Sequence, residues 1–600
     1  MSKKHLWRRS FAKSATVRFI CAPGLVDAAK EHAPLTRLRR ACLIAHERSA
    51  LLGLSRRFGH FLLRSSLSTY GTFFLLFSLF CILGRLIVGR FSFFELWFPT
   101  CLVLLVASIF LLHAKQSLSH AIGNSFLGRW LLFSVCRMPQ DRFVFGEERG
   151  EERRWWTLFA ALTLGVIGIW ISPVLLFLFP LVLLCVALLQ AVPELLWLAF
   201  LCLLPFLNLL VHTTAVLFIA VLAGELLWIG KVACGHRERH GGIVSRLVFL
   251  FGILPFLSGL FGLGGISTLL RGVVASVLVL SYFPLESFFS KPLWRRRAWI
   301  GIAFSAMITS ILGILQYFFG DLELRWVDVA RFSDIGGRVT SLFSNPNVLA
   351  VYLLLLFPLS LSGMLQKQEE TKLRFFFGLS AASELLCILL TWSRGAWLGC
   401  LFALVMLLLL HGKTSRRILG WSLLPIGIWL PFLPHNIVNR FSSIATVRES
   451  SIQYRIYTWQ GVCRMLARHP FGIGVGEEAF FALYRNFAVS GTETVPHTHN
   501  LLLQIAVELG MGGILCFGAV LVTFFGAVLG FLYKNGKSAS ACSVIGGFCA
   551  ILGALVMGFF DWIWYHYGLL WLFWTVLAAT VGMMRDLQDN DLERSFFSYL

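Results

Sequence analysis

Residues 346–366 of the chain read PNVLAVYLLLLFPLSLSGMLQ and contain no charged side chain. A helix needs about 20 such residues to cross the hydrocarbon core of a bilayer. Apolar runs of similar length recur from about Tyr70 to Met584, without the polar and apolar alternation of transmembrane β-strands. We therefore expect an all-α fold, a polytopic bundle of transmembrane helices.

The composition of the 600 residues agrees with this expectation. Hydrophobic residues make up 57% of the chain and charged residues 14%, and the mean hydropathy of +0.77 excludes a water-soluble globular protein. The formal net charge of +22 would suggest nucleic-acid binding, but the basic residues form short clusters that flank apolar segments. Because this placement is typical of membrane topology, we expect a lipid bilayer and no nucleic acid as partner.

We expect about 16 membrane spans, within a range of 12 to 16, from the apolar runs. Their predicted starts lie near Tyr70, Leu96, Trp155, Pro173, Pro193, Thr213, Leu247, Gly272, Trp299, Pro346, Phe375, Ala396, Leu419, Asn500, Ala541 and Asp561. With both termini in the cytoplasm, every basic loop falls on the cytoplasmic side of a plasma or inner membrane. The same alternation places two longer polar stretches, 319–345 and 435–499, on the extracytoplasmic face. We expect short helices at 451–468 and 477–487 in the second stretch.

Two arginines lie at the expected ends of apolar spans. Arg338 precedes Asn345-Pro346-Asn347, and its planar guanidinium suits phosphate oxygens. Arg394 lies between Trp392 and Trp397, where two spans meet almost without a loop. An arginine deep in a helix costs about 2.5 to 3.5 kcal/mol on insertion and usually faces a partner or a polar cavity. The alternatives are an interfacial anchor for Arg338 and packing between the tryptophans for Arg394.

The long polar stretch ends in a histidine pair. His497 and His499 lead into an apolar helix, and a histidine at a membrane–water boundary can act as general base toward a hydroxyl. Helix capping or interfacial packing is the ordinary alternative. Metal binding is a third option, but no acidic cluster accompanies the histidines, so we expect no metal. Upstream, the glycine-rich 472–476 lets backbone amides approach a ligand or a helix, although turn formation is the commoner role.

In combination these residues resemble the O-antigen ligase and O-antigen polymerase superfamily of integral membrane glycosyltransferases. His499-Asn500 followed by Gly510 and Gly513 matches the spacing of the family's signature after the longest exterior loop. The resemblance covers roughly 319–584. Further matching features are Arg338 before Asn345-Pro346-Asn347, the Ser393-to-Trp397 segment, Arg455, and His469 to Gly474. The basic N-terminal segment and about four leading spans exceed the family's usual layout.

The resemblance implies a GT-C-like membrane enzyme that transfers a glycan from a polyprenyl (undecaprenyl-type) diphosphate to an acceptor hydroxyl on the outer membrane face. It implies inversion and neither cofactor nor metal. Arg338, Arg394 and Arg455 would hold the diphosphate, because preorganised arginines can stabilise a leaving anion. His499 would be the base, and Asn347, Gly474, Gly476 and Asn500 would contact substrate. The acceptor would be a glycan, a glycolipid or a protein.

This interpretation also sets the expected organisation of the chain. Residues 1–68 would form a basic cytoplasmic segment, 69–318 the leading spans, 319–584 the catalytic membrane region with its exterior loop 435–499, and 585–600 a cytoplasmic tail. Ligase, polymerase and protein O-glycosyltransferase share the same donor chemistry, so the sequence leaves all three open. A non-enzymatic transporter of polysaccharide or lipid-linked glycan is the alternative function, in which embedded charges line a pathway. A structural membrane scaffold would not explain exterior arginines grouped with a histidine.

Overall fold

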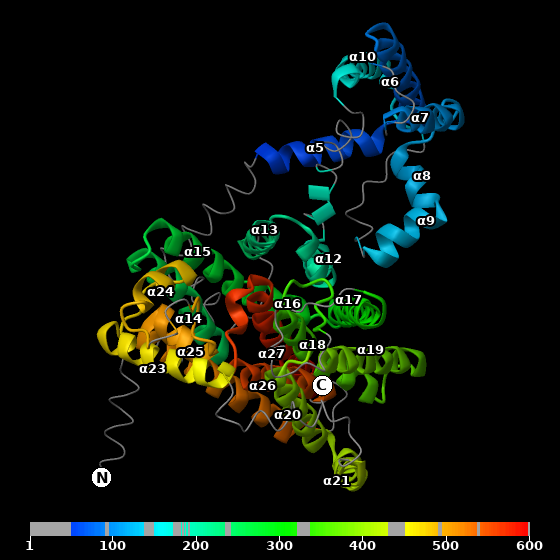
Figure 1. Ribbon diagram of the computed structural model, residues 1–600. Coiled ribbons are helices and arrows are strands. Elements are labelled where there is room, and N and C mark those ends of the chain that lie inside the picture. The colour runs from blue at the N-terminus through cyan, green and yellow to red at the C-terminus, as the bar shows by residue number, and fades with distance from the viewer. Residues whose placement is uncertain are drawn as a thin grey trace, which may run out of the picture. The chain divides into compact units, whose positions relative to one another are not determined.

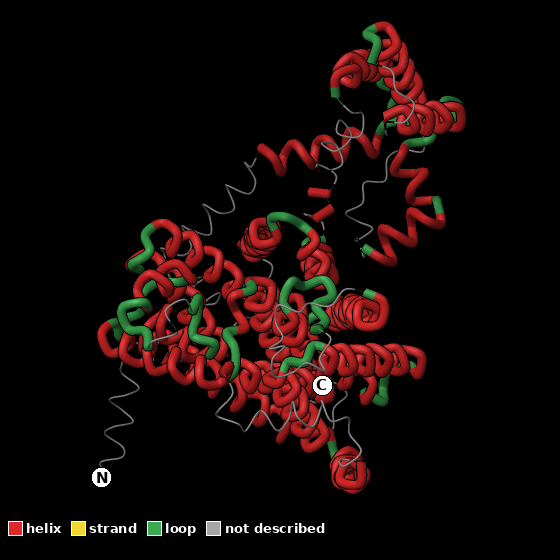
Figure 2. Tube along the Cα trace, in the orientation of Figure 1, coloured by secondary structure: helices red, strands yellow, loops and turns green. Residues whose placement is uncertain are grey.

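The structure is a computed structural model that describes residues 50–90, 97–136, 149–171, 192–233, 242–320, 337–429, 450–489, 495–536 and 541–597, with some single positions masked or added at the edges of these ranges. Among these residues helices dominate (Figure 2), and the β-type pairs are three isolated bridges without a strand. The predicted all-α fold is confirmed. The predictions for 1–49, for most of the 319–345 stretch and for 430–449 lie outside the described residues.

The chain divides into two compact units. The N-terminal unit contains Pro34–Leu196 and Ile229–His236, and the main unit contains Met1–Ala33, Trp197–Trp228 and Arg237–Leu600. In the N-terminal unit the described elements are α5 (Ala50–Arg64), α6 (Leu67–Ile87), α7 (Trp97–Leu111), α8 (Leu118–Asn124), α9 (Phe126–Arg129), the π-helix η1 (Trp130–Val135) and α10 (Arg154–Trp170).

A buried arginine holds the N-terminal unit together. Arg85 of α6 donates from Nε to the carbonyl oxygen of Gly168 at 2.9 Å, and its guanidinium carbon lies 4.6 Å from the centre of the Trp97 ring. The side chain thus joins α6 to the end of α10 and to the start of α7. An arginine inside an apolar helix is costly unless its donors find partners, and here backbone carbonyls and an aromatic face supply them.

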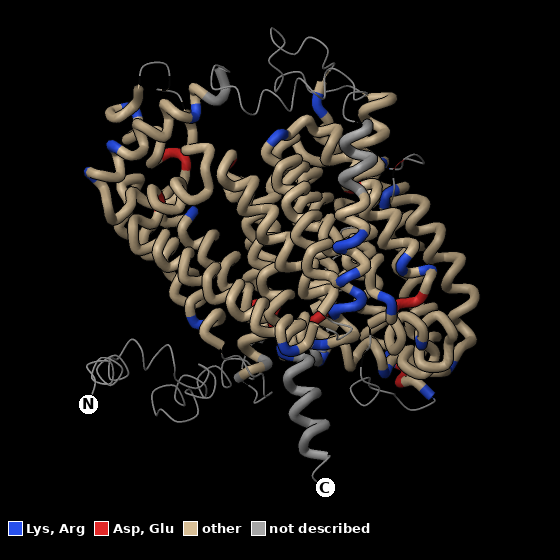
Figure 3. The backbone as a smooth tube through the Cα atoms, turned by 90° about the horizontal axis from the view of Figure 1, so that it is seen from below, with Lys and Arg blue, Asp and Glu red and all other residues tan. Residues whose placement is uncertain are grey.

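The main unit is an antiparallel bundle with a small helical region at one end (Figure 1). Its described helices are α12 (Glu194–Leu203), η3 (Leu204–Leu209), α13 (Thr213–Ala233), α14 (Ile243–Phe261), α15 (Ile266–Leu280), α16 (Tyr282–Phe289), α17 (Pro292–Phe319), α18 (Pro346–Leu365), α19 (Thr371–Leu390), α20 (Arg394–His411), α21 (Lys413–Trp429), α23 (Ser450–Arg468), α24 (Glu477–Tyr484), α25 (Leu501–Asn535), α26 (Ala541–Gly558), η7 (Ile563–Tyr565) and α27 (Tyr567–Phe597). Lys and Arg outnumber Asp and Glu along the described trace (Figure 3).

Eleven described helices are long and apolar enough to cross a membrane, and four further apolar helices are shorter. Fifteen of the predicted span starts lie within seven residues of a helix start in the structure, and the start near Pro173 lies outside the described residues. The predicted and observed helix starts agree best where a proline or a polar capping residue lies at the first turn. At α18, for example, Pro346 occupies the first turn and Asn345 caps it by accepting from the amide of Asn347.

Three helices form the centre of the main unit. In the apolar stretches of α18, α26 and α27, 83%, 78% and 94% of the residues are buried inside the protein. In the other candidate spans the buried share is between 22% and 50%. Close backbone contact permits this packing, because Gly399 of α20 and Gly553 of α26 face each other: a Cβ on either would lie within 3 Å of the other's carbonyl oxygen. The outer helices therefore keep apolar faces for lipid, while the central ones are enclosed by protein.

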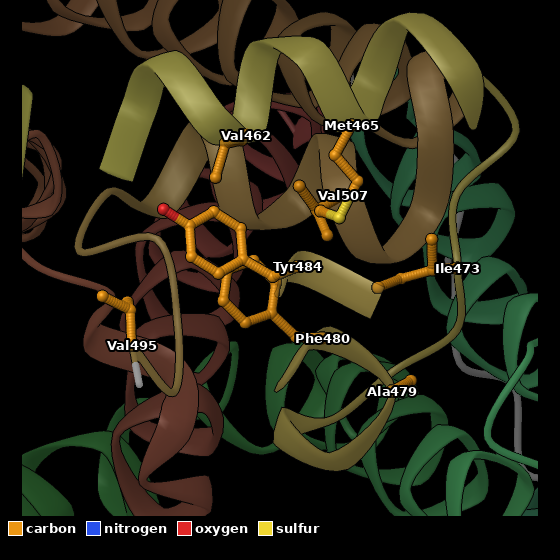
Figure 4. Packing of buried hydrophobic residues seen from close by; sticks show 8 residues of the cluster. All are labelled: Val462, Met465, Ile473, Ala479, Phe480, Tyr484, Val495 and Val507. Atoms are coloured by element: carbon orange, nitrogen blue, oxygen red, sulfur yellow. The ribbon is translucent and has the colours of Figure 1, made fainter. Parts of the chain in front are cut away.

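The described part of the long polar stretch is a small helical region with a core of its own. Helices α23 and α24 match the two short helices predicted at 451–468 and 477–487. Their buried residues surround Phe480 and Tyr484, whose rings stack with centroids 5.0 Å apart (Figure 4). Val507 of α25 belongs to the same cluster, so this core packs directly onto a membrane helix.

Helix α25 is broken at Gly510, and the break anchors the glycine-rich segment. Gly510 has φ 72° and ψ −173°, which interrupts the helical backbone. The amide of Ile473 donates to Val507 O, and the amide of Met511 donates to Pro470 O, both at 2.9 Å. A Cβ at position 510 would lie 2.4 Å from the carbonyl carbon of Phe471. Only glycine combines this positive φ with so close a backbone contact.

We expect Gly510→Ala to lower the free energy of unfolding by about 1 to 3 kcal/mol or more, because both the backbone angle and the contact with Phe471 would be strained. Gly518→Ala is the matched control on the same helix, since a Cβ there meets nothing within 4 Å. The measurement is the thermal unfolding midpoint of the detergent-solubilised protein. Equal midpoints for both variants would contradict this interpretation of the break.

Candidate active site

The candidate site lies where several helix ends of the main unit meet. Helices α18, α20 and α25 begin there, α26 ends there, and the turn 559–566 leads into α27. Side chains tie these ends together: the Nδ2 group of Asn500, the N-cap of α25, donates to Phe559 O at 3.1 Å, and that of Asn347 on α18 donates to Asp561 Oδ2 at 3.1 Å. The fold thereby brings residues from four parts of the sequence to one place.

Arg338 is buried and precisely held. Its side chain is only 6% exposed, its Nε donates to Thr391 O at 2.7 Å, and its Nη2 donates to Asn347 Oδ1 at 2.7 Å. The guanidinium therefore connects the end of α19 to the first turn of α18. A snorkelling anchor would extend toward water, so the interfacial alternative for Arg338 is wrong.

Asp561 lies at the centre of the site. Its Oδ2 accepts from Asn347, its Oδ1 accepts from the amide of Trp562 at 2.9 Å, and its Oδ1 is 3.4 Å from His499 Nδ1. Burial alone would raise the pKa of the Asp561 carboxyl. The hydrogen bond to His499 and the positive charges of His499, His497 and Arg455 outweigh burial and hold this pKa well below its usual value. Asp561 is thus a carboxylate across the physiological pH range.

The two histidines lie side by side but in different environments. His497 is buried, its ring stacks on Tyr565 with centroids 5.6 Å apart, and its Nδ1 accepts from the backbone amide of His499 at 3.2 Å. Burial, together with the charges of His499 and Arg455, lowers the pKa of His497 to about 4. The side chain of His499 is 25% exposed and its backbone has φ 51°, a left-handed angle that is uncommon outside glycine.

Arg455 of α23 acts on the same centre, and Arg394 begins α20 beside the turn that holds Asp561. Arg455 of α23 is close enough to act electrostatically on both Asp561 and His497. Arg394 is half-buried in the first turn of α20, and a Cβ on the adjacent Gly395 would lie 3.2 Å from Cβ of Phe560, the residue before Asp561. The alternative packing is also present, because the Trp392 and Trp397 rings contact each other at 5.6 Å between centroids.

Residues 376–518 match the O-antigen ligase family model. This part of the chain carries a match to an O-antigen ligase domain, and the match covers less than half of the chain. The match runs from α19 through the long polar stretch into α25, and it indicates a glycosyltransferase of the O-antigen ligase and polymerase type. No curated protein matches the chain significantly. The O-antigen ligase match includes Arg394, Arg455 and His499, whereas Arg338, Asn347 and Asp561 lie outside it.

Three of the residues predicted to contact substrate have clear structural roles. Asn500 caps α25 by accepting from the amide of Leu503 at 3.0 Å. The amides of Gly474 and Gly476 donate to the backbone and side-chain oxygens of Glu508 at 3.3 Å, and both glycines have positive φ. These contacts hold the glycine-rich segment against α25. Substrate binding by Asn500, Gly474 and Gly476 stays a prediction.

Asp561 changes the argument about metal. His497, His499 and Asp561 form the one group among the described residues that could hold a metal ion, with ligand atoms all within 4.8 Å of one another. The sequence argument against a metal relied on the absence of an acid near the histidines, and that reason is wrong because the fold supplies Asp561. The prediction that the enzyme uses no metal stays a prediction, and chelation can test it.

Sequence reasoning named Asp561 only as the start of a span and missed its place in the site. A usable signal was present, because Asp561 is the only Asp, Glu, Lys or Arg between residues 541 and 584. By span alternation it also falls on the same membrane face as His499. A lone charged residue at the end of a span, on the same face as His499, indicates a possible site residue.

Acid should destabilise the fold through its buried histidines. The pKa of His497 and that of His566 are both lowered to about 4, chiefly by burial. A histidine in the unfolded chain has a pKa of about 6.5, so the unfolded state binds more protons between these values and stability falls as the pH drops. Asp561 adds to this loss of stability only at lower pH, because the pKa of an aspartate in the unfolded chain is about 3.9.

We therefore expect the thermal midpoint to fall between pH 7 and pH 4.5, and to fall less in His497→Gln than in the unaltered protein. Protonation of one fully buried histidine lowers the free energy of unfolding by up to about 3 kcal/mol over this pH range. His212→Gln is the control, because His212 is exposed and should leave the full decrease in place. A decrease of the same size in His497→Gln would show that His497 does not carry this pH dependence.

Proposed function

We propose that the protein transfers a glycan from a polyprenyl diphosphate to an acceptor hydroxyl at the extracytoplasmic face of the inner membrane, with inversion and without a metal. One observation carries the proposal: a continuous set of contacts runs from Arg338 through Asn347 and Asp561 to His499. It brings a phosphate-binding type of side chain and a general base to one helix-end site. Residues 319–584 would be the catalytic region, preceded by a basic segment (1–68) and leading spans (69–318), with a cytoplasmic tail from 585.

The environments of the two histidines support His499 as the base. His497 has its Nδ1 occupied by a backbone amide, is buried, and has a pKa of about 4, so it is a poor proton acceptor at neutral pH. His499 directs Nδ1 toward Asp561, which leaves Nε2 for the acceptor hydroxyl. The carboxylate would orient the ring and stabilise the imidazolium that forms.

The reaction balances with these groups alone. The acceptor oxygen forms a bond to the anomeric carbon as its proton passes to His499 Nε2. The bond from the anomeric carbon to the phosphate oxygen breaks, and its electron pair leaves with the polyprenyl diphosphate. Attack from the face opposite the leaving group inverts the configuration at that carbon. The imidazolium then returns its proton to solvent.

Arginines would stabilise the departing diphosphate. Arg338 already donates two hydrogen bonds to protein oxygens, so its main contribution would be its fixed positive charge and the placement of Asn347. Arg394 and Arg455 would contact the phosphate oxygens directly. Charges held in place before the reaction stabilise a developing anion more than mobile ones do, because they need no reorganisation.

The sharpest test uses purified protein, lipid-linked glycan and acceptor. We expect His499→Ala to lower turnover about 100-fold or more while donor binding persists, because only proton transfer is lost. Asp561→Asn should lower turnover about tenfold or more, since the imidazolium loses its counter-ion. Arg394→Ala should weaken donor binding as well. Thin-layer or mass-spectrometric detection of product gives the rate.

His411→Ala is the matched control, because His411 lies at the far end of α20 and bonds Ser415. It should keep full activity. Normal turnover by His499→Ala would reject the assigned base, and absence of any sugar transfer by the unaltered protein would favour a transporter. In cells lacking the protein, accumulated single repeat units would indicate a polymerase, and finished but unattached chains would indicate a ligase.

Chelation separates arginine stabilisation from metal catalysis. We expect turnover to be unchanged after incubation with excess EDTA, because positive charge from Arg338, Arg394 and Arg455 replaces that of a divalent cation. Loss of turnover on chelation, with recovery on adding Mg²⁺ or Zn²⁺, would instead assign the group His497, His499 and Asp561 to a metal.

A further inference from the structure

The turn that carries His499 has a strained backbone that its neighbours hold in place. His499 has φ 51°, and a left-handed angle at a residue with a side chain persists only where the surroundings enforce it. Thr498, the preceding residue, is buried. Its amide donates to Gln504 Oε1 and its carbonyl oxygen accepts from Trp459 Nε1, both at 2.9 Å. The peptide groups on both sides of Thr498 are therefore fixed immediately before His499.

We propose that Gln504 is a positioning residue for His499, and that it acts by holding the amide of Thr498. The held turn keeps Nδ1 of His499 directed at Asp561. This inference rests on the proposed function, in which His499 is the base. Gln504 lies in the first turn of α25, where its own amide donates to Asn500 O at 2.9 Å. Its side chain is buried and reaches back to the turn, so the helix start carries both the capping residue and the group that holds the histidine.

Glu508, one turn further along α25, sets the orientation of the Gln504 side chain. The Thr498 amide can only donate, so the carbonyl oxygen of Gln504 must face it and the NH₂ group must face the other way. That group donates from Nε2 to Oε1 of Glu508 at 3.0 Å. A side chain with the opposite orientation would bring two donors together at Thr498. An acceptor at position 508 therefore selects the orientation that the histidine turn requires.

The same carboxyl group links the histidine turn to the glycine-rich segment. The amide of Gly476 donates to Oε1 of Glu508 at 3.3 Å. Three hydrogen bonds thus connect Gly476 to Thr498 through two buried side chains, those of Glu508 and Gln504. Removing a partner from a buried network leaves the remaining groups unsatisfied, so the arrangement depends on each member. Gln504 consequently influences the reaction through the backbone that precedes His499.

Gln504→Leu should lower kcat about tenfold or more, because it removes the acceptor for the Thr498 amide and a small displacement of a catalytic group has a large effect on rate. We expect the KM for the lipid-linked glycan to stay within about twofold, since Arg394 and Arg455 are unchanged. Gln366→Leu is the matched control. Gln366 follows α18 at its far end and accepts one hydrogen bond at 3.2 Å, so this variant should keep its kcat.

A variant that swaps the two side chains separates the hydrogen bonds from packing. In Gln504→Glu/Glu508→Gln the carboxylate at position 504 accepts from Thr498, and the amide at position 508 donates to that carboxylate and accepts from the glycine-rich segment. Every contact is retained, so kcat should return to within about threefold of the unaltered protein. Gln504→Glu alone should restore less, because it places two carboxyl groups in contact. Added to His499→Ala, Gln504→Leu should change residual turnover less than about twofold, because effects that pass through one residue are not additive.

Hydrogen–deuterium exchange of residues 495–500, measured by mass spectrometry on the purified protein, gives a readout that needs no sugar transfer. We expect faster exchange there in Gln504→Leu and regained protection in the swapped variant. Unchanged kcat and protection in Gln504→Leu, no recovery in the swapped variant, or a further loss of turnover in the His499→Ala background would overturn the positioning role. Absence of transfer by the unaltered protein would instead overturn the proposed function and with it the catalytic role of Gln504, while a loss of protection would still establish its hold on the turn.

Discussion

The buried carboxylate of Asp561 sets the requirements for the residues around it. Asp561 is only 5% exposed, and an isolated buried charge is very costly, so its oxygens must be satisfied by donors. Asn347, the amide of Trp562 and His499 supply them from three separate segments. Each donor is itself fixed: Arg338 holds Asn347, and the cap at Asn500 fixes the residue next to His499. This end of the bundle is therefore organised around the charge of Asp561.

The sequence was sufficient to predict the helices and to name several residues that the fold brings together, for physical reasons. Apolar length and terminal prolines or caps locate spans such as α18, and His499 with its downstream glycines is a local pattern. The His499–Asp561 contact could not be predicted in this way, because it depends on how α25 and the turn after α26 pack. The break of α25 at Gly510 was likewise hidden: a glycine in an apolar run is compatible with a continuous helix until the backbone of Phe471 is found against it.

The structure also gives the glycine-rich segment a role that composition alone left open. Its amides are bonded to α25 and to Glu508, so the loop that carries α23, and with it Arg455, is fastened to the same helix that presents His499. His499 and Arg455 are thus both carried by segments that are fixed to α25.

The most direct measurement is a structure of the protein with a non-hydrolysable polyprenyl diphosphate sugar bound. Our account requires the diphosphate oxygens to lie within hydrogen-bonding distance of Arg394 and Arg455, with the anomeric carbon facing Nε2 of His499 across the space for an acceptor. A diphosphate bound elsewhere in the bundle, or one that coordinates a cation held by His497, His499 and Asp561, would contradict it.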